Sequence, residues 1–585
     1  MNRRRLRIGT GGRLLVDLWA LALAGVLCLP ALRRPGLGLS GDLVFSPHQP
    51  LTDDTLGLGG RLARAVPLDA VVSLLGDLVG GDVLFRVAVV AGPALAGWGA
   101  ARLIPEARTP TRVVAATVAI WNPFVVERLA LGQWALLLAY GCLVHLVAIG
   151  LRIRPTDGSA RLVRLLPWVA LASLTPTGGV LAVLTCVVLP RVGWRPRLAL
   201  LGAGAAFQLP WLLPSLLAGS ATLSDPAGVA AFASRSDAPG GVVVSLLGLG
   251  GVWDGDSVPT SRGTFLGVLA ALAVVAVLVL AVPLLSAAQR RLVPLALGGL
   301  VLALAGSVPV GSDVVRFLVR TVPGGGLLRD GQKWLLLLVL LVVLCVAVLV
   351  ERAATALAER ETGTQGILLG AVLLPLVLLP DATAATWPTV EPVRYPADFS
   401  AVRRDLAAAG DVGLLTTAPW RGYRRFDWGN DRTAFDPASA WFDVPVVGSD
   451  DRVVGSRTIR GEDRTAVRVH AALDAADPAS ALARAGVRWV LVYTDDPDTP
   501  YLRLDGLDVV HDGADLRLLR VPGAVAEPDR ASSGVRLLVV VVVVDLAVAL
   551  LALLSALWPV TRRLFGRVAL SLARPSAGRQ EGGTS

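Results

Sequence analysis

Charged residues are scarce in this chain of 585 residues. They make up 17% of the sequence against 54% for hydrophobic residues, and the mean hydropathy is +0.64. Soluble domains usually contain about a quarter charged residues. The composition therefore argues against an ordinary soluble protein and favours an integral membrane protein.

Cysteine and lysine are also rare, and each shortage excludes a class of protein. The four cysteines (Cys28, Cys142, Cys186 and Cys345) lie in apolar runs, so the polar segments can form no disulfide and no CxxC metal motif exists. Lys333 is the single lysine among 55 basic residues. The arginines form short clusters between apolar stretches rather than a basic face with interleaved aromatics, so the net charge of +10 predicts no nucleic-acid partner.

Long apolar runs predict an α-helical polytopic membrane protein with about twelve transmembrane helices. The runs lie near residues 14–32, 83–104, 111–123, 131–151, 164–175, 178–190, 197–217, 264–286, 292–309, 333–350, 366–382 and 535–558. Three of them, at 111–123, 164–175 and 178–190, are short and cross the bilayer only if the helices tilt.

Arginine placement predicts the orientation of these helices. Clusters in alternate short connections fall on the same side as the basic N-terminus, and they contain Arg108, Arg112, Arg152, Arg154, Arg161, Arg164, Arg191, Arg195, Arg197, Arg290, Arg291, Arg352, Arg360, Arg562, Arg563 and Arg567. Because such loops stay in the cytoplasm, we expect a multi-pass plasma-membrane protein in contact with membrane lipid, with both termini inside.

Residues 383–534 differ from the rest and are expected to form an extracytoplasmic α/β domain. Residues 479–494 (ASALARAGVRWVLVYT) predict a helix, a glycine turn and a buried strand, and residues 507–521 (LDVVHDGADLRLLRV) predict a hairpin. The expected organisation is a multi-helix membrane domain over 1–382, this domain, a final transmembrane helix over 535–558, and a disordered cytoplasmic tail over 559–585.

The loop after the first helix contains three candidate catalytic acids, Asp42, Asp53 and Asp54. A carboxylate held at the outer surface could serve as general base towards an acceptor hydroxyl, or help to hold a divalent cation such as Mg²⁺ or Mn²⁺. The alternative is that these residues cap turns and face water. The same loop ends in LDAVVSLLGDLV (68–79), whose apolar spacing predicts a helix lying flat on the membrane.

Two further motifs place basic residues at the expected outer surface. In NPFVVERLALGQW (122–134), Arg128 departs from the positive-inside tendency, which indicates either a partner in Glu127 or an anionic ligand, and a structural corner between two helices is an equal alternative. In PGGGLLRDGQKW (323–334), Arg329 and Lys333 stand one turn apart if the helix has begun, and could clamp a phosphate. The alternative is that both side chains snorkel to lipid headgroups.

Aromatic residues are concentrated between 420 and 442 and are interleaved with charges. Trp420, Tyr423, Arg424 and Trp428 are the candidates for binding a sugar, because ring faces stack on sugar C–H groups while charged groups bond to hydroxyls. Core packing explains aromatic residues equally well.

Together these features resemble the GT-C superfamily of polyprenyl-phosphate-sugar-dependent glycosyltransferases. The motifs NPFVVERLALGQW and RDGQKW are similar to those of actinobacterial membrane proteins of that type, distantly related to the cell-envelope arabinofuranosyltransferases and to YfhO-like proteins. The resemblance implies sugar transfer from a polyprenyl-phosphate donor to a glycan or lipid acceptor on the outer face. Asp42 would then be the base, Arg128, Glu127, Arg329 and Lys333 would bind the donor phosphate, and residues 383–534 would position the acceptor.

A transporter or lipid flippase is the competing class, and a non-catalytic envelope scaffold is a third. Twelve helices, with His145 and Asp545 as candidate proton carriers and Asp17 as a further intramembrane acid, would suit transport. The two halves of the chain show no repeat symmetry to support it.

Overall fold

The computed structural model describes residues 10–58, 65–154, 156–157, 159–217, 224–322, 324–357, 361–411, 413–454, 457–461, 463–526 and 543. The predicted last span over 535–558 is therefore outside the described residues except for position 543, and so are Asp545 and the predicted tail over 559–585.

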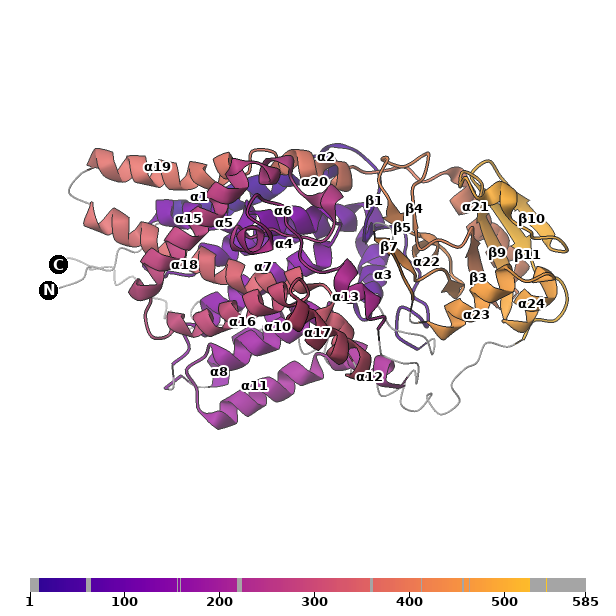
Figure 1. The fold of residues 1–585 in the computed structure, drawn as a ribbon, viewed down its shortest axis with the longest axis horizontal. Helices are drawn as coiled ribbons and strands as arrows, with labels where there is room; N and C mark the ends of the chain where they lie inside the picture. Colours follow the sequence, from indigo (N-terminus) through magenta and orange to yellow (C-terminus); the bar gives the residue numbers. More distant parts are fainter. Residues whose placement is uncertain are drawn as a thin grey trace, which may run out of the picture.

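The first part of the chain is a bundle of apolar helices, drawn in indigo to red in Figure 1. Its helices are α1 Thr10–Leu27, α2 Leu29–Arg33, α3 Leu68–Val79, α4 Gly81–Ala100, α5 Thr109–Ile120, α6 Pro123–Ala130, α7 Trp134–Gly150, α8 Ser159–Leu162, α9 Leu166–Ala172, α10 Pro176–Val188, α11 Trp194–Ala206, α12 Leu209–Leu217, α13 Ala227–Ala231, α14 Val242–Leu247, α15 Phe265–Ala281, α16 Leu292–Ala305, α17 Pro309–Thr321, α18 Leu336–Ala356, α19 Glu361–Leu378 and α20 Ala382–Val390. Helix α18 is buried along most of its length and packs against α5, α15 and α16, so it forms the centre of the bundle.

Each predicted span up to residue 382 contains a helix, which confirms a mostly helical membrane protein. Within the described residues, three segments are long and apolar enough to cross a bilayer alone: Gly81–Ala100, Phe265–Leu284 and Gly331–Ala356. Three bent pairs would each make a broken span: Thr109–Ile120 with Pro123–Ala130, Gln289–Ala305 with Pro309–Thr321, and Gln365–Leu378 with Ala382–Val390. The count of twelve and the orientation stay predictions.

The second part is a small α/β unit, drawn in orange and yellow at the opposite end of the molecule from α8 and α19 (Figure 1). Its elements are α21 Ala397–Ala409, β3 Leu414–Ala418, β4 Tyr423–Arg424, β5 Ala434–Phe435, α22 Ala438–Trp441, β6 Val446–Val447, β7 Arg452–Val454, β8 Arg457–Ile459, α23 Arg464–Leu473, α24 Pro478–Arg484, β9 Val487–Tyr493, β10 Asp508–Asp512 and β11 Leu516–Arg520.

A mixed five-stranded sheet in the order β10-β11-β9-β3-β6 organises this unit. Strand β3 runs parallel to β6 and β9, whereas β11 runs antiparallel to β9 and β10. The predicted helix, glycine turn and strand are α24, Gly486 and β9, and the predicted hairpin is β10–β11. Both expectations are confirmed.

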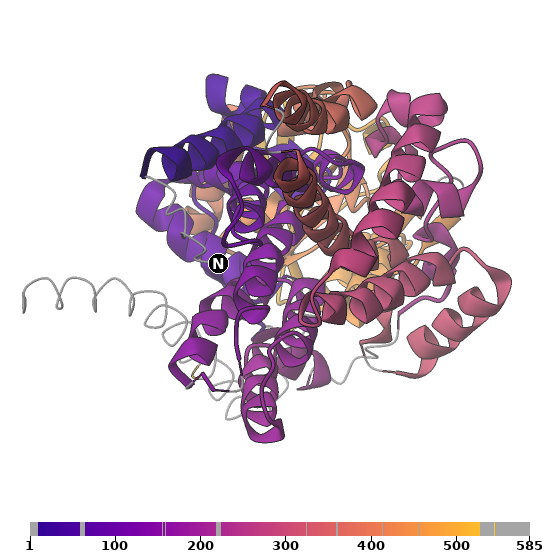
Figure 2. The same cartoon turned by 90° about the vertical axis from the view of Figure 1, so that its left-hand side faces the viewer.

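A short hairpin links the two parts of the molecule. Its strands, β1 Leu39–Ser40 and β2 Leu43–Val44, lie between the helices and the large sheet (Figure 1), which stands behind the bundle when seen from the helical end (Figure 2). The backbone of Leu37 exchanges hydrogen bonds of 3.0 and 2.9 Å with Val393. Gly41 N donates to Thr433 O at 2.8 Å, and Phe435 N donates to Gly41 O at 2.9 Å. Asp42, at the hairpin turn, is therefore held at the junction of the two parts.

Candidate functional site

The turn that carries Asp42 packs directly on the corner between α6 and α7. Asp42 N donates to Leu131 O at 3.2 Å. Gly132 has φ of 77°, and a Cβ there would come within 2.6 Å of Ser40 O. Only glycine fits this conformation and this approach without strain. The corner thus fixes where the carboxylate stands.

Three side chains from distant parts of the sequence bind the Asp42 carboxylate. Gln133 Nε2 donates to Oδ2 at 3.1 Å, Tyr423 OH donates to Oδ1 at 2.7 Å, and Arg452 Nη1 lies 3.3 Å from Oδ1. Arg452 also donates to the Tyr423 hydroxyl. The Asp42 side chain remains 34% exposed, so a substrate group can still reach it.

The surroundings of Asp42 favour its ionised form. Burial alone would raise the pKa of its carboxyl, but Arg452, the hydrogen bonds from Tyr423 and Gln133, and the charge of Lys333 together hold the pKa below its ordinary value. Asp42 is therefore a carboxylate at neutral pH, the form that can accept a proton.

Arg452 is a site residue that the sequence analysis missed. Its guanidinium lies 4.0 Å from the centroid of the Tyr423 ring and 4.9 Å from that of Trp253. Stacking between two rings fixes the plane of the guanidinium. As one of several arginines in a polar stretch of the sequence, Arg452, the first residue of β7, carries no sequence signal of this role.

Arg128 is fully buried, and its partner is Asp330 rather than Glu127. The two side chains form a bidentate pair with N···O distances of 2.7 and 2.8 Å. Arg128 Nε also donates to Gln332 Oε1 and Nη1 to Gln133 Oε1, both at 2.7 Å. Gln133 thus joins Arg128 to Asp42. These partners lie inside the motifs singled out from the sequence, which identified the regions but not the pairing.

Arg329 and Lys333 occupy different surroundings rather than forming one clamp. The chain enters α18 through two short 3₁₀ helices, Gly325–Leu328 and Gly331–Leu335, which Asp330 separates. Lys333 Nζ lies 3.6 Å from Asp330 Oδ2 and its side chain is 26% exposed. Arg329 instead lies 6.0 Å from the centroid of the Phe232 ring. That ring packs edge-on against Trp253, so Arg329 borders the same aromatic group as Arg452.

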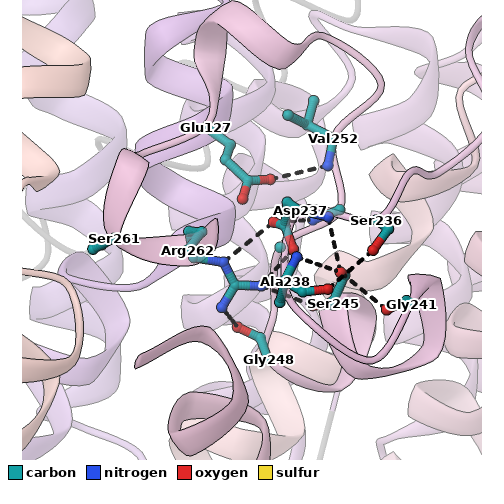
Figure 3. Close-up of polar contacts among 12 residues, drawn as sticks. Glu127, Ser236, Asp237, Ala238, Gly241, Ser245, Gly248, Val252, Ser261 and Arg262 are labelled. Carbon is teal, nitrogen blue, oxygen red and sulfur yellow. Dashed lines mark hydrogen bonds and ion pairs between the residues drawn. The ribbon is translucent and has the colours of Figure 1, made fainter. Parts of the chain in front are cut away.

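Glu127 faces the protein interior, as Figure 3 shows. Its Oε2 accepts hydrogen bonds from Val252 N at 3.2 Å and from Gln332 Nε2 at 3.0 Å. Beside it, Asp237 and Arg262 form a buried ion pair of 2.9 Å. Gln332 accepts a hydrogen bond from Arg128 with its other side-chain atom, so Glu127 helps to orient the side chain that binds Arg128.

The approach of these groups depends on Gly250. A Cβ at this position would come within 2.6 Å of Glu127 Oε1 and would also collide with Asp237 and Arg262. Glu127 Oε1 has no hydrogen-bond partner among the described residues. Glu127 is therefore a buried residue behind the Arg128 network, without direct access to a ligand.

Neither Asp53 nor Asp54 is among the side chains that bind the Asp42 carboxylate. Asp53 is exposed, and Asp54 lines a cavity of about 230 Å³ together with Asp69 and Asp450, whereas Asp42 is not part of this lining. No group of three or more His, Cys, Asp or Glu side chains within the described ranges is arranged to hold a metal ion. The divalent cation stays a prediction.

The aromatic candidates also lie in different places. Trp420 stacks on His470 with ring centroids 4.9 Å apart, Tyr423 belongs to the Asp42 network, and Trp428 borders a groove near Trp387. Much of the remaining aromatic patch is core, since Phe426, Trp441 and Phe442 are buried.

Arg424 is buried inside the α/β unit. Its guanidinium lies 3.2 Å from both Asp436 and Asp496 and 4.3 Å from the centroid of the Tyr493 ring. These contacts occupy its hydrogen-bonding groups, so the side chain joins strands rather than presenting a charge to a ligand.

The intramembrane candidates of the transport hypothesis have local partners. Asp17 pairs with Arg102 at 3.2 Å, and the His145 ring stacks on Trp168 with centroids 3.9 Å apart. Asp545 lies outside the described residues.

Comparison with known proteins relates this fold to a membrane glycosyltransferase. The sequence matches no protein-family model and no curated protein. The cryo-EM structure of the arabinofuranosyltransferase AftD from mycobacteria is similar, with a TM-score of 0.52 and 17% identity over 88% of this chain. A mutant form of AftD gives a TM-score of 0.49 and 16% identity over 89% of this chain. The match spans 40% of the AftD chain in the first structure and 42% in the second. At this identity the likeness shows that the two chains share a fold.

Proposed function

We propose that this protein transfers a sugar from a polyprenyl-phosphate donor to a glycan or lipid acceptor of the cell envelope, at the outer face of the plasma membrane. The observation that carries the proposal is the Asp42 carboxylate, partly exposed and held ionised beside Lys333 and Arg452 at the junction between the helices and the α/β unit. The AftD-like fold supports the same class of reaction.

In the proposed reaction, the acceptor hydroxyl oxygen forms a bond to the anomeric carbon and the bond from that carbon to the phosphate oxygen breaks. Asp42 accepts the hydroxyl proton, and polyprenyl phosphate leaves. Lys333, beside Asp330, binds the donor phosphate, and Arg329 approaches it from a separate position beside Phe232; both side chains are partly exposed. Arg128 and Glu127 lie behind them and hold Asp330, Gln332 and Gln133 in place.

The arrangement of the molecule also supports the outer face. The Asp42 hairpin lies where the α/β unit meets the helices, and this unit lies at the end of the molecule opposite α8, which belongs to an arginine-rich connection (Figure 1). Loops of that kind stay in the cytoplasm.

The replacement Asp42→Asn tests the proposal because it removes the base while keeping the shape of the side chain. Purified protein in lipid nanodiscs would receive radiolabelled polyprenyl-phosphate arabinofuranose, chosen because AftD is an arabinofuranosyltransferase, and envelope glycan as acceptor. We expect the transfer rate to fall by about 10²–10⁴-fold, the usual contribution of a general base.

Asp53→Asn is the matched control, because Asp53 is exposed in the same loop, and it should keep the wild-type rate. An Asp42→Asn protein with undiminished transfer would contradict the assignment of the base. A folded wild-type protein that transfers sugar from none of a panel of polyprenyl-phosphate donors would contradict the proposed function itself.

A further inference from the structure

An open groove lies beside the hairpin that carries Asp42. It has a volume of about 660 Å³, and its lining includes Trp387, Glu391 and Arg394 on one wall and Trp428 and Asn430 on the other. This size falls within the range of about 300–1,000 Å³ that is typical of small-molecule sites.

The side chains of the groove suit an uncharged, hydroxyl-rich ligand. Trp387 is 37% exposed and offers indole surface for stacking on a sugar ring. Trp428 packs against Phe426, Tyr395 and Phe399 on its core side and is partly exposed, so only its outer part is available. Arg394 is exposed and adds hydrogen-bond donors, while Glu391, whose Oε1 accepts a hydrogen bond from Arg34, adds carboxylate oxygen to the lining. The Asn430 side chain donates to Pro388 O at 2.9 Å, while its Oδ1 has no partner among the described residues. Exposed indole beside hydrogen-bonding side chains favours an oligosaccharide, whose rings can stack and whose hydroxyls both donate and accept hydrogen bonds.

Both walls of the groove are hydrogen-bonded to the Asp42 hairpin. On one side, Val393 pairs with Leu37 through bonds of 2.9 and 3.0 Å. On the other, the segment that begins with Trp428 and Asn430 continues to Thr433, which accepts a hydrogen bond from Gly41 N at 2.8 Å. A ligand in the groove would therefore lie against the two segments that hold the candidate base.

We propose that this groove is an acceptor subsite that binds a neutral oligosaccharide and brings its hydroxyl end towards Asp42. The proposal rests on the proposed glycosyltransferase function and adds the acceptor's class and place. Trp387 and Trp428 stack on the sugar rings, while Arg394 and Glu391 bond to hydroxyls.

Saturation-transfer NMR on the nanodisc-embedded protein tests the subsite without any donor. The probes are linear oligosaccharides of arabinofuranose, galactofuranose and glucose. We expect wild-type protein to bind at least one of them, and Trp387→Ala and Arg394→Ala each to weaken that binding by about tenfold, the effect of losing about 1.4 kcal/mol. Trp194→Ala is the matched control, because Trp194 is 67% exposed on the distant helix α11 and should leave binding unchanged.

Arg394 provides the safer of the two tests, because Trp387 Nε1 also donates to Val26 O at 2.8 Å and its loss could disturb the contact with α1. Equal oligosaccharide binding by wild type and Arg394→Ala would overturn the proposal. It would also be overturned if the oligosaccharide bound in phosphatidylcholine nanodiscs but was displaced when phosphatidylglycerol was added, because the groove would then prefer the anionic lipid headgroup.

The groove and the reaction can fail separately. Asp42→Asn should bind the oligosaccharide as wild type does while losing transfer. A wild-type protein that transfers sugar but binds no oligosaccharide probe contradicts the subsite alone. If a folded protein binds the oligosaccharide in a way that requires Arg394 but transfers no sugar, the subsite is supported and the proposed function is contradicted.

Discussion

The chemistry of Asp42 is set by residues that are far from it in sequence. Gln133 belongs to the α6–α7 corner, Tyr423 to β4 and Arg452 to β7. Because Arg452 is the nearest positive charge, it should contribute most to keeping the carboxylate ionised against the effect of burial.

Replacing Arg452 with glutamine should shift the acidic limb of the pH–rate profile. The native pKa of Asp42 is depressed, so activity that needs the carboxylate is present at neutral pH and is lost only as the pH falls through that low pKa. Without Arg452, burial dominates and the pKa rises. We expect the limb to move up by about one pH unit, measured as sugar transfer against pH.

Arg457→Gln, on the partner strand of the same hairpin, is the control and should leave the limb in place. If the acidic limb of the pH–rate profile is unchanged in Arg452→Gln, a group other than Asp42 controls the loss of activity at low pH.

Sequence could identify some of these residues but not their relationships. Asp42, Arg128 and Lys333 stood out as polar groups next to apolar runs, and the structure brings them into one network through Gln133 and Asp330. Neighbouring positions in sequence were a poor guide to contacts, because the Asp42 carboxylate bonds to Gln133, Tyr423 and Arg452 rather than to the acids of its own loop. The partner of Arg128 lies 202 positions away, beyond any local pattern.

The hairpin that carries Asp42 depends on the close approach of the corner between α6 and α7. Alanine at position 132 would have to adopt φ of 77° and place its Cβ within 2.6 Å of Ser40 O and 2.7 Å of Leu43 N. Relief requires the hairpin to move away from the corner, taking Asp42 with it.

Gly132→Ala should therefore lower both stability and activity. We expect about 1–3 kcal/mol of destabilisation from backbone strain, measured by thermal unfolding in detergent, together with a loss of transfer. Gly298→Ala in α16 is the matched control. A Cβ there meets no atom within 4 Å, so the replacement should be neutral or stabilise by up to about 1 kcal/mol. Equal melting of the two variants would show that the corner tolerates the added carbon.

Regular elements were the most predictable part of the fold. The α24–β9 unit and the β10–β11 hairpin follow from local spacing and turn residues, and the apolar runs up to residue 382 all contain helices. The break at Asp330 between two 3₁₀ helices could not be inferred, because it is stabilised by Arg128 and Lys333 rather than by local propensity.

At the scale of the whole molecule, the Arg128–Asp330 pair fastens α6 to the start of α18 inside the bundle. A buried charge that loses its partner is costly, by about 3–5 kcal/mol. The pair is thus a structural connection as well as a support for Lys333.

Arg128→Met should destabilise the protein strongly because it strands Asp330. Adding Asp330→Asn should recover part of the lost stability. The double variant should therefore be more stable than the sum of the two single effects predicts. A double-mutant cycle of unfolding free energies measures this difference. Arg316→Met is the control, since its pair with Asp313 is exposed and should contribute about 0–1 kcal/mol. If the effects of the two single replacements on the unfolding free energy simply add, the Arg128–Asp330 pair does not connect the two helices energetically.

The pairing of Leu37 with Val393 and of Gly41 with Thr433 and Phe435 also has a consequence for biosynthesis. Asp42 emerges from the ribosome early, but Tyr423 and Arg452 are translated 381 and 410 residues later. Until then the carboxylate lacks its hydroxyl and guanidinium partners, and the groove lacks a wall. A partly translated chain already inserted in the membrane therefore has an incomplete Asp42 site. The site is complete only after the late-translated α/β unit folds onto the first loop.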